Sequence, residues 1–536
     1  MFGQMMQMPL TISSVLDFAA KYHSEAEIVS RMVEGPLHRY DYGSMAGRAR
    51  KLANALTRLG VEKGERVGTL AWNTHRHVEA YFAVSCMGAV CHTINPRLFA
   101  EQFVFIVNHA EDRVLFVDLT FIPMIEKLAD QLPTVRAYVV MTGHEHMPVS
   151  SLPNLLCYED LLAAERDDFT WPELDENQAA SLCYTSGTTG DPKGVLYSHR
   201  STVLHAMTMI FPDTMGLSAC DALLPVVPMF HVNAWGLPYS AAMTGAKLVL
   251  PGPRMDGASL AALIRDEGVT VTAGVPTVWF NLLNHLDQNG ESLGVLELVV
   301  VGGSTCPAWM FDTFARHGVR IVHAWGMTET SPLGTANTAK RATMRLSHDE
   351  KRLVELKQGR PPFGIDLKIV DADNRPLPHD GVSSGALKVR GAWVCDGYFR
   401  HEGSAAHAEP GWFDTGDIAS IDPLGYVQIV DRAKDVIKTG GEWISSIDLE
   451  NVALSHPAVR EAAAIGRPHH KWGERPVVIV VLKPEVEAAP EEIRAFYEGK
   501  VGKCFEPDEV IITDALPHNA TGKVMKAELR LRYCSV

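Results

Sequence analysis

Hydroxyl, glycine and lysine residues are concentrated in one short stretch of the chain, from Tyr184 to Gly194. Its sequence, YTSGTTGDPKG, holds three glycines and one lysine, Lys193, among serines and threonines. Glycines let backbone N–H groups crowd around an anion, hydroxyls add donors, and a lysine adds positive charge. The stretch therefore predicts a cradle for a polyphosphate, with a flexible surface loop as the alternative. It is not a Walker A loop, because Lys193 is followed by Gly194 rather than by Ser or Thr.

Two glycine-bearing stretches come directly after candidate strands. The apolar residues 179–183 precede the Tyr184–Gly194 loop, and the β-branched run 298–301 precedes Gly302-Gly303-Ser304. In open α/β sheets, ligands gather outside the carboxyl ends of the strands. We therefore expect both stretches to lie at such an edge.

Short β-branched runs alternate with helix-length segments through most of the chain, which predicts layered, doubly wound α/β sheets. From Gly364 the pattern changes to strands and hairpins, and the last hundred or so residues mix both types. The expected organisation is a large N-terminal domain with a β-rich subdomain, then a small α+β C-terminal domain. Their predicted bounds are 1–431 for the large domain, about 360–431 for its β-rich subdomain and 432–536 for the small domain.

The composition is that of an ordinary soluble globular protein, with 46% hydrophobic and 21% charged residues in 536. A net charge of −15 argues against nucleic acid as the main partner. The nine cysteines contain no C-x-x-C pair, which is typical of reduced thiols in a cytosolic enzyme. No run approaches the ~18 apolar residues of a membrane span, so we expect a cytoplasmic protein.

Five motifs, in one order, together resemble those of the adenylate-forming superfamily of acyl-CoA synthetases, luciferases and peptide-synthetase adenylation domains. The resemblance runs from about residue 42 to residue 530. It implies ATP-dependent formation of an acyl-adenylate from a carboxylic acid, followed by transfer of the acyl group to the thiol of coenzyme A. The motifs are the Tyr184–Gly194 loop and residues 325–330, 411–417, 431–435 and 517–523.

The resemblance assigns the loop to the β- and γ-phosphates of ATP. Glu329 is implied as the ligand of Mg²⁺, a hard cation that prefers oxygen, and Thr328 as a contact of the α-phosphate. An ordinary surface glutamate is the alternative for Glu329. The phosphate contacts implied are Thr185, Ser186, Gly187, Thr188, Thr189, Gly190 and Lys193.

The same resemblance implies a nucleoside site built from three parts of the chain. Asp417 and Arg432 would hold the ribose, although an aspartate in a D-T-G-D sequence also stabilises turns. The adenine would lie in a slot where absent side chains admit a flat ring. The slot residues implied are Gly302, Gly303, Ser304, Trp325 and Gly326.

The C-terminal motifs imply a small domain that moves between the two half-reactions. Lys523 would bridge the carboxylate and the α-phosphate in the first, and the hinge at 431–435 would turn about Lys434. Gly440, Gly441 and Trp443 would then line a tunnel for the pantetheine arm of CoA, with a loop glycine pair as the alternative.

Within the superfamily, the sequences 92–98, 228–236 and 440–450 resemble the fatty-acyl and medium-chain acyl-CoA synthetase branch. His231 is then implied between the acyl and thiol sites, and Trp235, with Gly302, as a wall or gate of the acyl pocket. A core histidine and a packing tryptophan are the alternatives. The likeness favours 3-methylmercaptopropionate or a similar short acid, although no residue specifies a thioether.

Three other functions are open from the sequence. One is a medium- or long-chain fatty acyl-CoA ligase, because one methylene changes binding by only ~1–3 kcal/mol. Another is a luciferase-like monooxygenase, against which the branch sequences argue. The third, an inactive nucleotide-binding regulator, is disfavoured because Glu329, Asp417, Lys434 and Lys523 are all present. The resemblance also makes a homodimer possible.

Overall fold

The computed structural model describes every residue except 2, 186–191, 440–441, 485, 504, 519–523 and 535–536, together with the side chains of 442–443. The chain divides into two compact units. The first comprises residues 1–365 and 390–404, and the second comprises residues 366–389 and 405–536. The segment 390–404 thus returns to the first unit after the chain has entered the second.

One sheet of the first unit is parallel except at one edge, where β8 and β9 form an antiparallel hairpin around the Tyr184–Gly194 loop. The described strands are arranged in the order β7 (Leu155–Cys157), β6 (Ala137–Val140), β5 (Asp112–Val117), β3 (Arg66–Leu70), β4 (Val90–Thr93), β8 (Ala179–Tyr184) and β9 (Gly194–Ser198).

The second sheet of the first unit is parallel in its centre and antiparallel at both ends. Its described strands are arranged in the order β15 (Thr335–Ala336), β14 (Arg320–Trp325), β13 (Leu298–Val301), β12 (Val271–Gly274), β10 (Ala222–Pro225), β11 (Lys247–Leu250), β1 (Glu27–Arg31) and β2 (Leu37–Asp41).

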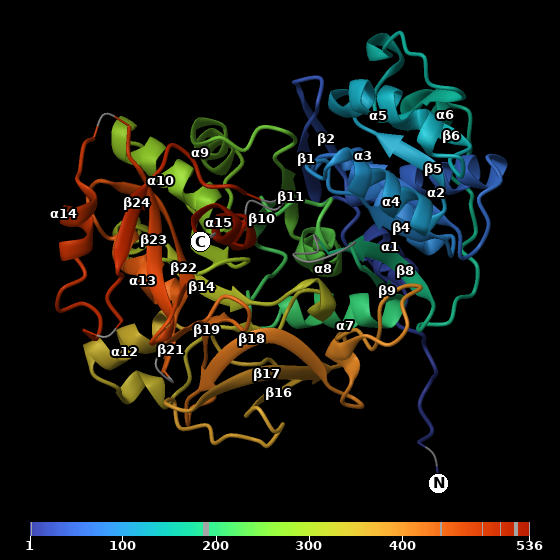
Figure 1. The fold of residues 1–536 in the computed structure, drawn as a ribbon. Helices are drawn as coiled ribbons and strands as arrows, with labels where there is room; N and C mark the ends of the chain where they lie inside the picture. The colour runs from blue at the N-terminus through green and yellow to red at the C-terminus, as the bar shows by residue number, and fades with distance from the viewer. Residues whose placement is uncertain are drawn as a thin grey trace. The chain divides into compact units, whose positions relative to one another are not determined.

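Helices cover the faces of both sheets, as parallel crossovers require (Figure 1). Helix α3 contacts strands of both sheets, namely β1, β3, β4 and β8. The helices of this unit are α1 (Ile12–Tyr22), α2 (Tyr42–Arg58), α3 (His75–Cys86), α4 (Ala100–Ala110), α5 (Ile122–Leu128), α6 (Tyr158–Ala163), α7 (His199–Met209), α8 (Leu237–Thr244), α9 (Gly257–Asp266), α10 (Pro276–Asn289), α11 (Ala308–Arg316) and α12 (His348–Glu355).

Local sequence explains where these helices begin and end. Helix α7 begins with a capping box. The N–H of Ser201 donates to Ser198 Oγ, and the N–H of Ser198 donates to Ser201 Oγ, both at 3.0 Å. Helix α10 begins with Pro276 and ends at Gly290, whose φ of 65° is the left-handed conformation that glycine tolerates.

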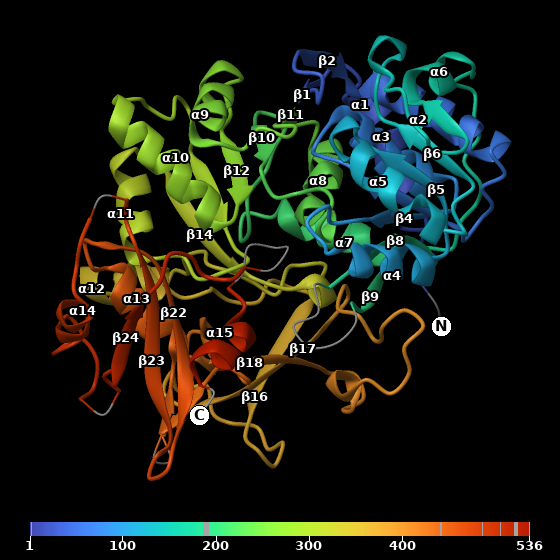
Figure 2. The ribbon, with the colours of Figure 1, turned by 45° about the horizontal axis from the view of Figure 1, so that its top comes forward.

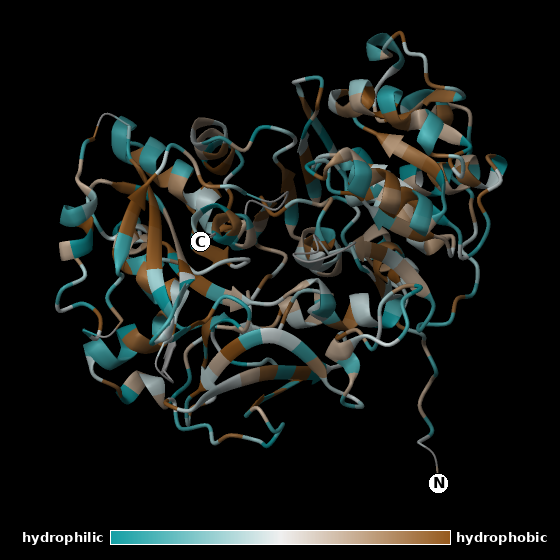
Figure 3. Cartoon of the chain, viewed as in Figure 1, coloured by the Kyte–Doolittle hydropathy of each residue, from teal (hydrophilic) through white to brown (hydrophobic). Residues whose placement is uncertain are grey.

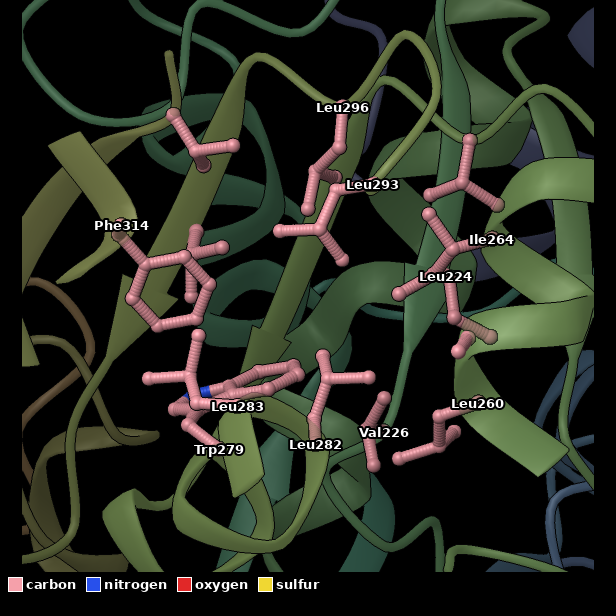
Figure 4. Packing of buried hydrophobic residues seen from close by; sticks show 14 of the residues in the cluster. Leu224, Val226, Leu260, Ile264, Trp279, Leu282, Leu283, Leu293, Leu296 and Phe314 are labelled. Atoms are coloured by element: carbon pink, nitrogen blue, oxygen red, sulfur yellow. The ribbon is translucent and has the colours of Figure 1, made fainter. Parts of the chain in front are cut away.

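A large apolar core lies beneath α9, α10 and α11, which Figure 2 shows along one side of the strands β12 and β14. Trp279 is fully buried there and meets Phe314 edge-on, with ring centres 6.2 Å apart. Figure 4 shows Leu282 and Leu283 near this indole, with Leu224 farther along the same core. The core holds β13, whose carboxyl end carries Gly302-Gly303-Ser304, through Val299 and Val301.

The second unit contains two more sheets. The four-stranded sheet has the order β16 (Ile365–Val370), β17 (Ser384–Gly391), β18 (Phe413–Ile421) and β19 (Val427–Arg432). The other described sheet is β21 (Glu442–Ile444), β20 (Ile437–Thr439), β23 (Gly473–Leu482) and β22 (Val459–His469), with β24 (Glu509–Ile512) parallel to β23. Its helices are α13 (Ser446–Leu454), α14 (Pro490–Ala495) and α15 (Lys526–Tyr533).

The predicted fold class is confirmed: layered α/β sheets, a β-rich sheet and a C-terminal α+β part are all present. Figure 3 shows the sheet strands largely in hydrophobic colours, as expected for strands covered on their faces. The predicted boundary at 431 and the hinge at 431–435 remain predictions. Within the described part of the chain, no helix combines the length and apolar character needed to cross a membrane.

Candidate functional site

The two ends of the Tyr184–Gly194 loop are tied together at the edge of the seven-stranded sheet. The backbone N–H of Thr185 donates to the carbonyl of Lys193 at 2.9 Å, and the N–H of Lys193 lies 3.4 Å from Thr185 Oγ1. These bonds continue the β8–β9 hairpin, so Thr185 and Lys193 frame the loop mouth. The implied contacts Ser186, Gly187, Thr188, Thr189 and Gly190 lie outside the described residues.

Lys193 and Glu329 contact opposite parts of one aromatic side chain, that of Tyr398. The Lys193 Nζ lies 4.9 Å from the centre of the Tyr398 ring, within the range of a cation–π contact. The Tyr398 hydroxyl donates to Glu329 Oε1 at 2.8 Å, and Glu329 is only 6% exposed. The structure thus brings together two implied site residues through a third that the sequence analysis missed. Tyr398 has no repeated spacing or flanking pattern that points to it.

The Trp325–Thr330 segment follows β14 and is held by bonds to its backbone. The carbonyl of Thr328 accepts from the Tyr197 hydroxyl at 2.6 Å, and the carbonyl of Glu329 accepts from the N–H of Cys395 at 2.8 Å. A Cβ on Gly326 would lie 1.4 Å from the carbonyl oxygen of Pro332, so only glycine fits there. Thr328 and Glu329 are both buried, which separates them from ordinary surface residues.

The stretch Gly302–Ser304 lies at the carboxyl end of β13, beside the end of β14. A Cβ on Gly302 would come within 3.1 Å of the Trp235 ring and 3.2 Å of the carbonyl oxygen of Ala324. The Trp235 ring therefore lies against Gly302, as the implied acyl wall requires. Trp325, by contrast, packs its ring over Gly334, where a Cβ would lie 2.3 Å from ring carbon Cζ3.

Trp235 is carried by a turn of left-handed backbone. The φ angles of Val232, Asn233, Ala234 and Trp235 lie between 49° and 55°, and Gly236 follows at 68°. Residues other than glycine rarely adopt this conformation, and a β-branched valine does so at a cost. The turn is anchored where the Asn233 amide donates to Ser181 Oγ on β8 at 2.8 Å. Strain of this kind is concentrated at functional sites, which supports a role for the segment that begins at His231.

A buried histidine supports the same turn from α7. A Cβ on Gly236 would lie 2.8 Å from the Nδ1 atom of His205, so the imidazole fills the space that a side chain would need. Burial without a compensating charge lowers the pKa of His205 to about 3. The ring is therefore neutral at physiological pH and presents no cation to the turn.

In the second unit, Asp417 and Arg432 face each other across β18 and β19. Arg432 Nε lies 2.9 Å from Asp417 Oδ1, and its guanidinium also donates to the carbonyl of Thr415 at 3.1 Å. The Asp417 side chain is 4% exposed, whereas that of Arg432 is 39% exposed. A buried carboxylate with a partly open guanidinium can accept from vicinal hydroxyls while its charge stays compensated.

The predicted hinge begins inside a cluster of buried charges, also in the second unit. Asp431 accepts from the N–H groups of Arg432 and Ser446, at 2.7 and 2.6 Å, and burial raises its pKa. Lys526 Nζ lies 2.6 Å from Glu450 Oε1 and 2.5 Å from Ser446 Oγ. Lys434 itself is exposed. The implied residues Lys523, Gly440 and Gly441, and the side chain of Trp443, lie outside the part that the structure describes.

The residues around Glu329 fit a magnesium ion held mainly by a nucleotide. Among the described residues, no group of three or more His, Cys, Asp or Glu side chains is placed to hold a metal. Mg²⁺ in nucleotide enzymes is usually held by one or two carboxylates, with phosphates and water completing the shell. One buried carboxylate, oriented by a hydroxyl, satisfies that requirement.

Two protein-family models match the chain, one over its larger N-terminal part and the other near its C-terminus. Residues 16–399 match the model described as AMP-binding enzyme, and residues 448–523 match that of the AMP-binding enzyme C-terminal domain. Together these ranges include every predicted site residue except those at positions 417–443.

Curated relatives extend over almost the whole chain. The chain is 52% identical to a 3-methylmercaptopropionyl-CoA ligase of Ruegeria lacuscaerulensis, over 99% of this chain and 98% of that protein. It is also 52% identical to a medium-chain-fatty-acid–CoA ligase of Ectopseudomonas oleovorans, again over 99% and 98%. A long-chain-fatty-acid–CoA ligase of Thermus thermophilus is 45% identical, over 99% and 96%.

The fold matches solved structures of enzymes of the same kind. An anthranilate CoA ligase in complex with anthranoyl-AMP superposes with a TM-score of 0.87 at 25% identity, covering 98% of each chain. A fatty acyl CoA synthetase of Mycobacterium tuberculosis gives a TM-score of 0.70 at 26% identity, also over 98% of each chain.

Proposed function

The chain belongs to the AMP-binding enzyme family and is an acyl-CoA ligase that uses ATP and CoA, and we propose that its acid is 3-methylmercaptopropionate or a similar short acid. The observation that carries this choice is the 52% identity, over nearly all of both chains, to a ligase named for that acid. A second ligase of that name, from Ruegeria pomeroyi, is 50% identical over 100% of this chain. A role in dimethylsulfoniopropionate demethylation follows from the same acid and is equally a proposal.

The described residues support the expected division of labour. Lys193 would supply positive charge beside the loop that would hold the β- and γ-phosphates. Glu329 offers a buried carboxylate that would hold Mg²⁺, and that ion would supply positive charge to offset the charge of the phosphates. Asp417 and Arg432 would orient the ribose. Catalysis by such residues is mainly positioning and electrostatic stabilisation, because the carboxylate of the substrate is itself the nucleophile.

The region around Trp235 supports a short acyl pocket. Its indole lies against Gly302, and His205, neutral by burial, packs under the adjoining turn. An apolar wall at that position would limit the length of the acid while leaving room for a thioether or a methylene chain of similar size. Cytoplasmic location, Mg²⁺ dependence and a homodimer belong to the same proposal.

A medium-chain acid is the second candidate, favoured by the equal 52% identity to the medium-chain ligase. A panel of acids, assayed for AMP formation with CoA and Mg-ATP, distinguishes the two. We expect the highest kcat/KM for 3-methylmercaptopropionate or butyrate. Rapid turnover of octanoate with no turnover of 3-methylmercaptopropionate would overturn the short-acid proposal, and absence of any acid-dependent pyrophosphate release would overturn ligase activity altogether.

Trp235→Ala tests whether the Trp235 indole limits the length of the acid. Removal of the indole from Gly302 should shift the optimum toward longer acids, as expected for a wall of the pocket. An unchanged order of preference would remove Trp235 from the acyl site.

A further inference from the structure

Tyr398 lies in the segment 390–404, which makes several contacts with other parts of the first unit. The N–H of Cys395 donates to the carbonyl of Glu329, and the N–H of Phe399 donates to the carbonyl of Gly194, both at 2.8 Å. Upstream, the indole N–H of Trp393 donates to the carbonyl of Leu333 at 2.8 Å. The segment is therefore bonded both to the end of the phosphate loop and to the Trp325–Thr330 motif.

The side chain of Tyr398 makes the same connection between charged groups. Its ring faces Lys193 Nζ at 4.9 Å, and its hydroxyl donates to Glu329 Oε1 at 2.8 Å. A phenol that donates to a carboxylate becomes more electron-rich, which strengthens attraction of its ring for a cation, as hydrogen bonds in a chain polarise one another. The two contacts therefore reinforce each other.

We propose that Tyr398 is a positioning residue. It orients the Lys193 ammonium and the Glu329 carboxylate for binding of a nucleoside triphosphate with its divalent cation. This inference rests on the proposed function and adds a residue to it. Donation to Oε1 fixes the plane of the carboxylate while leaving lone pairs for a hard cation. The ring limits the directions that the flexible lysine side chain samples.

The ring and the hydroxyl of Tyr398 contact different charged groups, so variants that lose one or both should differ in how they bind nucleotide. Tyr398→Phe keeps the ring near Lys193 but removes the hydroxyl from Glu329. Tyr398→Leu removes both. The first change should therefore weaken the cation-dependent part of nucleotide binding alone, and the second should also weaken the part that depends on Lys193.

The test is calorimetric titration of the full-length protein with ATP, without acid or CoA, in excess Mg²⁺ and again in EDTA. For Tyr398→Phe we expect the Kd of Mg-ATP to rise about tenfold, the Kd in EDTA to stay within about twofold, and the Mg²⁺ concentration for half-maximal adenylation to rise by a similar factor. For Tyr398→Leu we expect both dissociation constants to rise.

Tyr158→Phe is the matched control. The Tyr158 hydroxyl donates to a buried glutamate, Glu79 Oε2, at 2.7 Å, so this variant loses a bond of the same type elsewhere in the first unit. It should leave both dissociation constants and the Mg²⁺ requirement unchanged. Wild-type-like binding by Tyr398→Phe, with native thermal unfolding, overturns the role of Tyr398. Failure of the wild-type protein to bind Mg-ATP would instead refute the proposed function.

Discussion

The proposed phosphate site of the first unit and the proposed ribose site and hinge of the second are assembled in different ways. Tyr398 and Glu329, which make contact, are 69 residues apart in sequence and belong to no common element. Asp417 and Arg432 are direct partners in the register of neighbouring strands, β18 and β19. The first arrangement depends on a segment that returns from another part of the chain, whereas the second follows from local hairpin geometry.

Both units bury paired charges, such as Arg76 and Glu34 in the first, and some other buried polar groups are neutral. The first unit keeps His205 and His323 buried and neutral, with pKa values lowered by burial to about 3 and about 4. The second unit buries charges and pairs them, as Lys526 is paired with Glu450 near Asp431. Removing one member of a buried charge pair leaves its partner uncompensated, so a pair such as Lys526 and Glu450 should be more sensitive to a single substitution than an exposed ion pair.

The largest expected effect is on the stability of the second unit. Lys526→Met leaves Glu450 buried without its partner and should lower the free energy of unfolding by about 3–5 kcal/mol. Urea unfolding followed by circular dichroism measures it. Arg532→Met, which removes an exposed partner of Glu528 on the same helix, should cost no more than about 1 kcal/mol. Similar losses of unfolding free energy for both variants would contradict the expected difference between the Lys526–Glu450 pair and the more exposed Arg532–Glu528 pair.

Lys523→Ala tests the mobile-domain part of the proposal. Adenylation should fall by about 10²–10³, as for loss of other preorganised donors, while thioester formation from pre-made acyl-AMP stays largely intact. Pyrophosphate exchange measures the first half-reaction, and AMP release from acyl-AMP with CoA measures the second. Equal loss of both would argue against a lysine that acts in only one state.

Asp417→Asn tests the hairpin-built ribose site. Loss of a charge-assisted hydrogen bond costs about 1.5–3 kcal/mol, so the KM for ATP should rise roughly 10–100-fold, with little change in the KM for the acid. Asp366→Asn, at an exposed position of β16 in the same sheet, should leave both constants unchanged. A change confined to the KM for the acid would contradict a role of Asp417 in binding the ribose.

The smallest effect at neutral pH concerns the neutral histidines of the first unit, which lower the stability only in acid. Because the pKa of folded His205 is about 3, below that of an unfolded histidine, the unfolded chain binds more protons between about pH 6.5 and 3. Stability should therefore fall as pH falls through this window, by at most about 1.4 kcal/mol per pH unit for this one group. His205→Phe should remove that slope in urea-unfolding series, whereas His348→Phe, at an exposed position, should not.

Much of the secondary structure was predictable because it depends on local patterns. The runs 179–183 and 298–301 lie in β8 and β13, and the change of pattern at Gly364 comes directly before β16. The coupled positions of Gly302 and Trp235 needed the resemblance to a family, since no local pattern links the residue after β13 with a distant turn. The left-handed turn at Val232–Trp235 was not predictable, because its residues do not favour that conformation on their own.

Residue types and their order along the chain were enough to predict an acid-activating enzyme, from a hydroxyl- and glycine-rich loop with Lys193, the Glu329 motif, Asp417 and Arg432. These features are local in sequence, and their residue types carry the chemistry. Only the tertiary structure decided which groups meet. Tyr398 contacts Lys193 and Glu329 because the segment 390–404 returns to the first unit, and such a contact is set by chain topology and packing rather than by any spacing along the sequence.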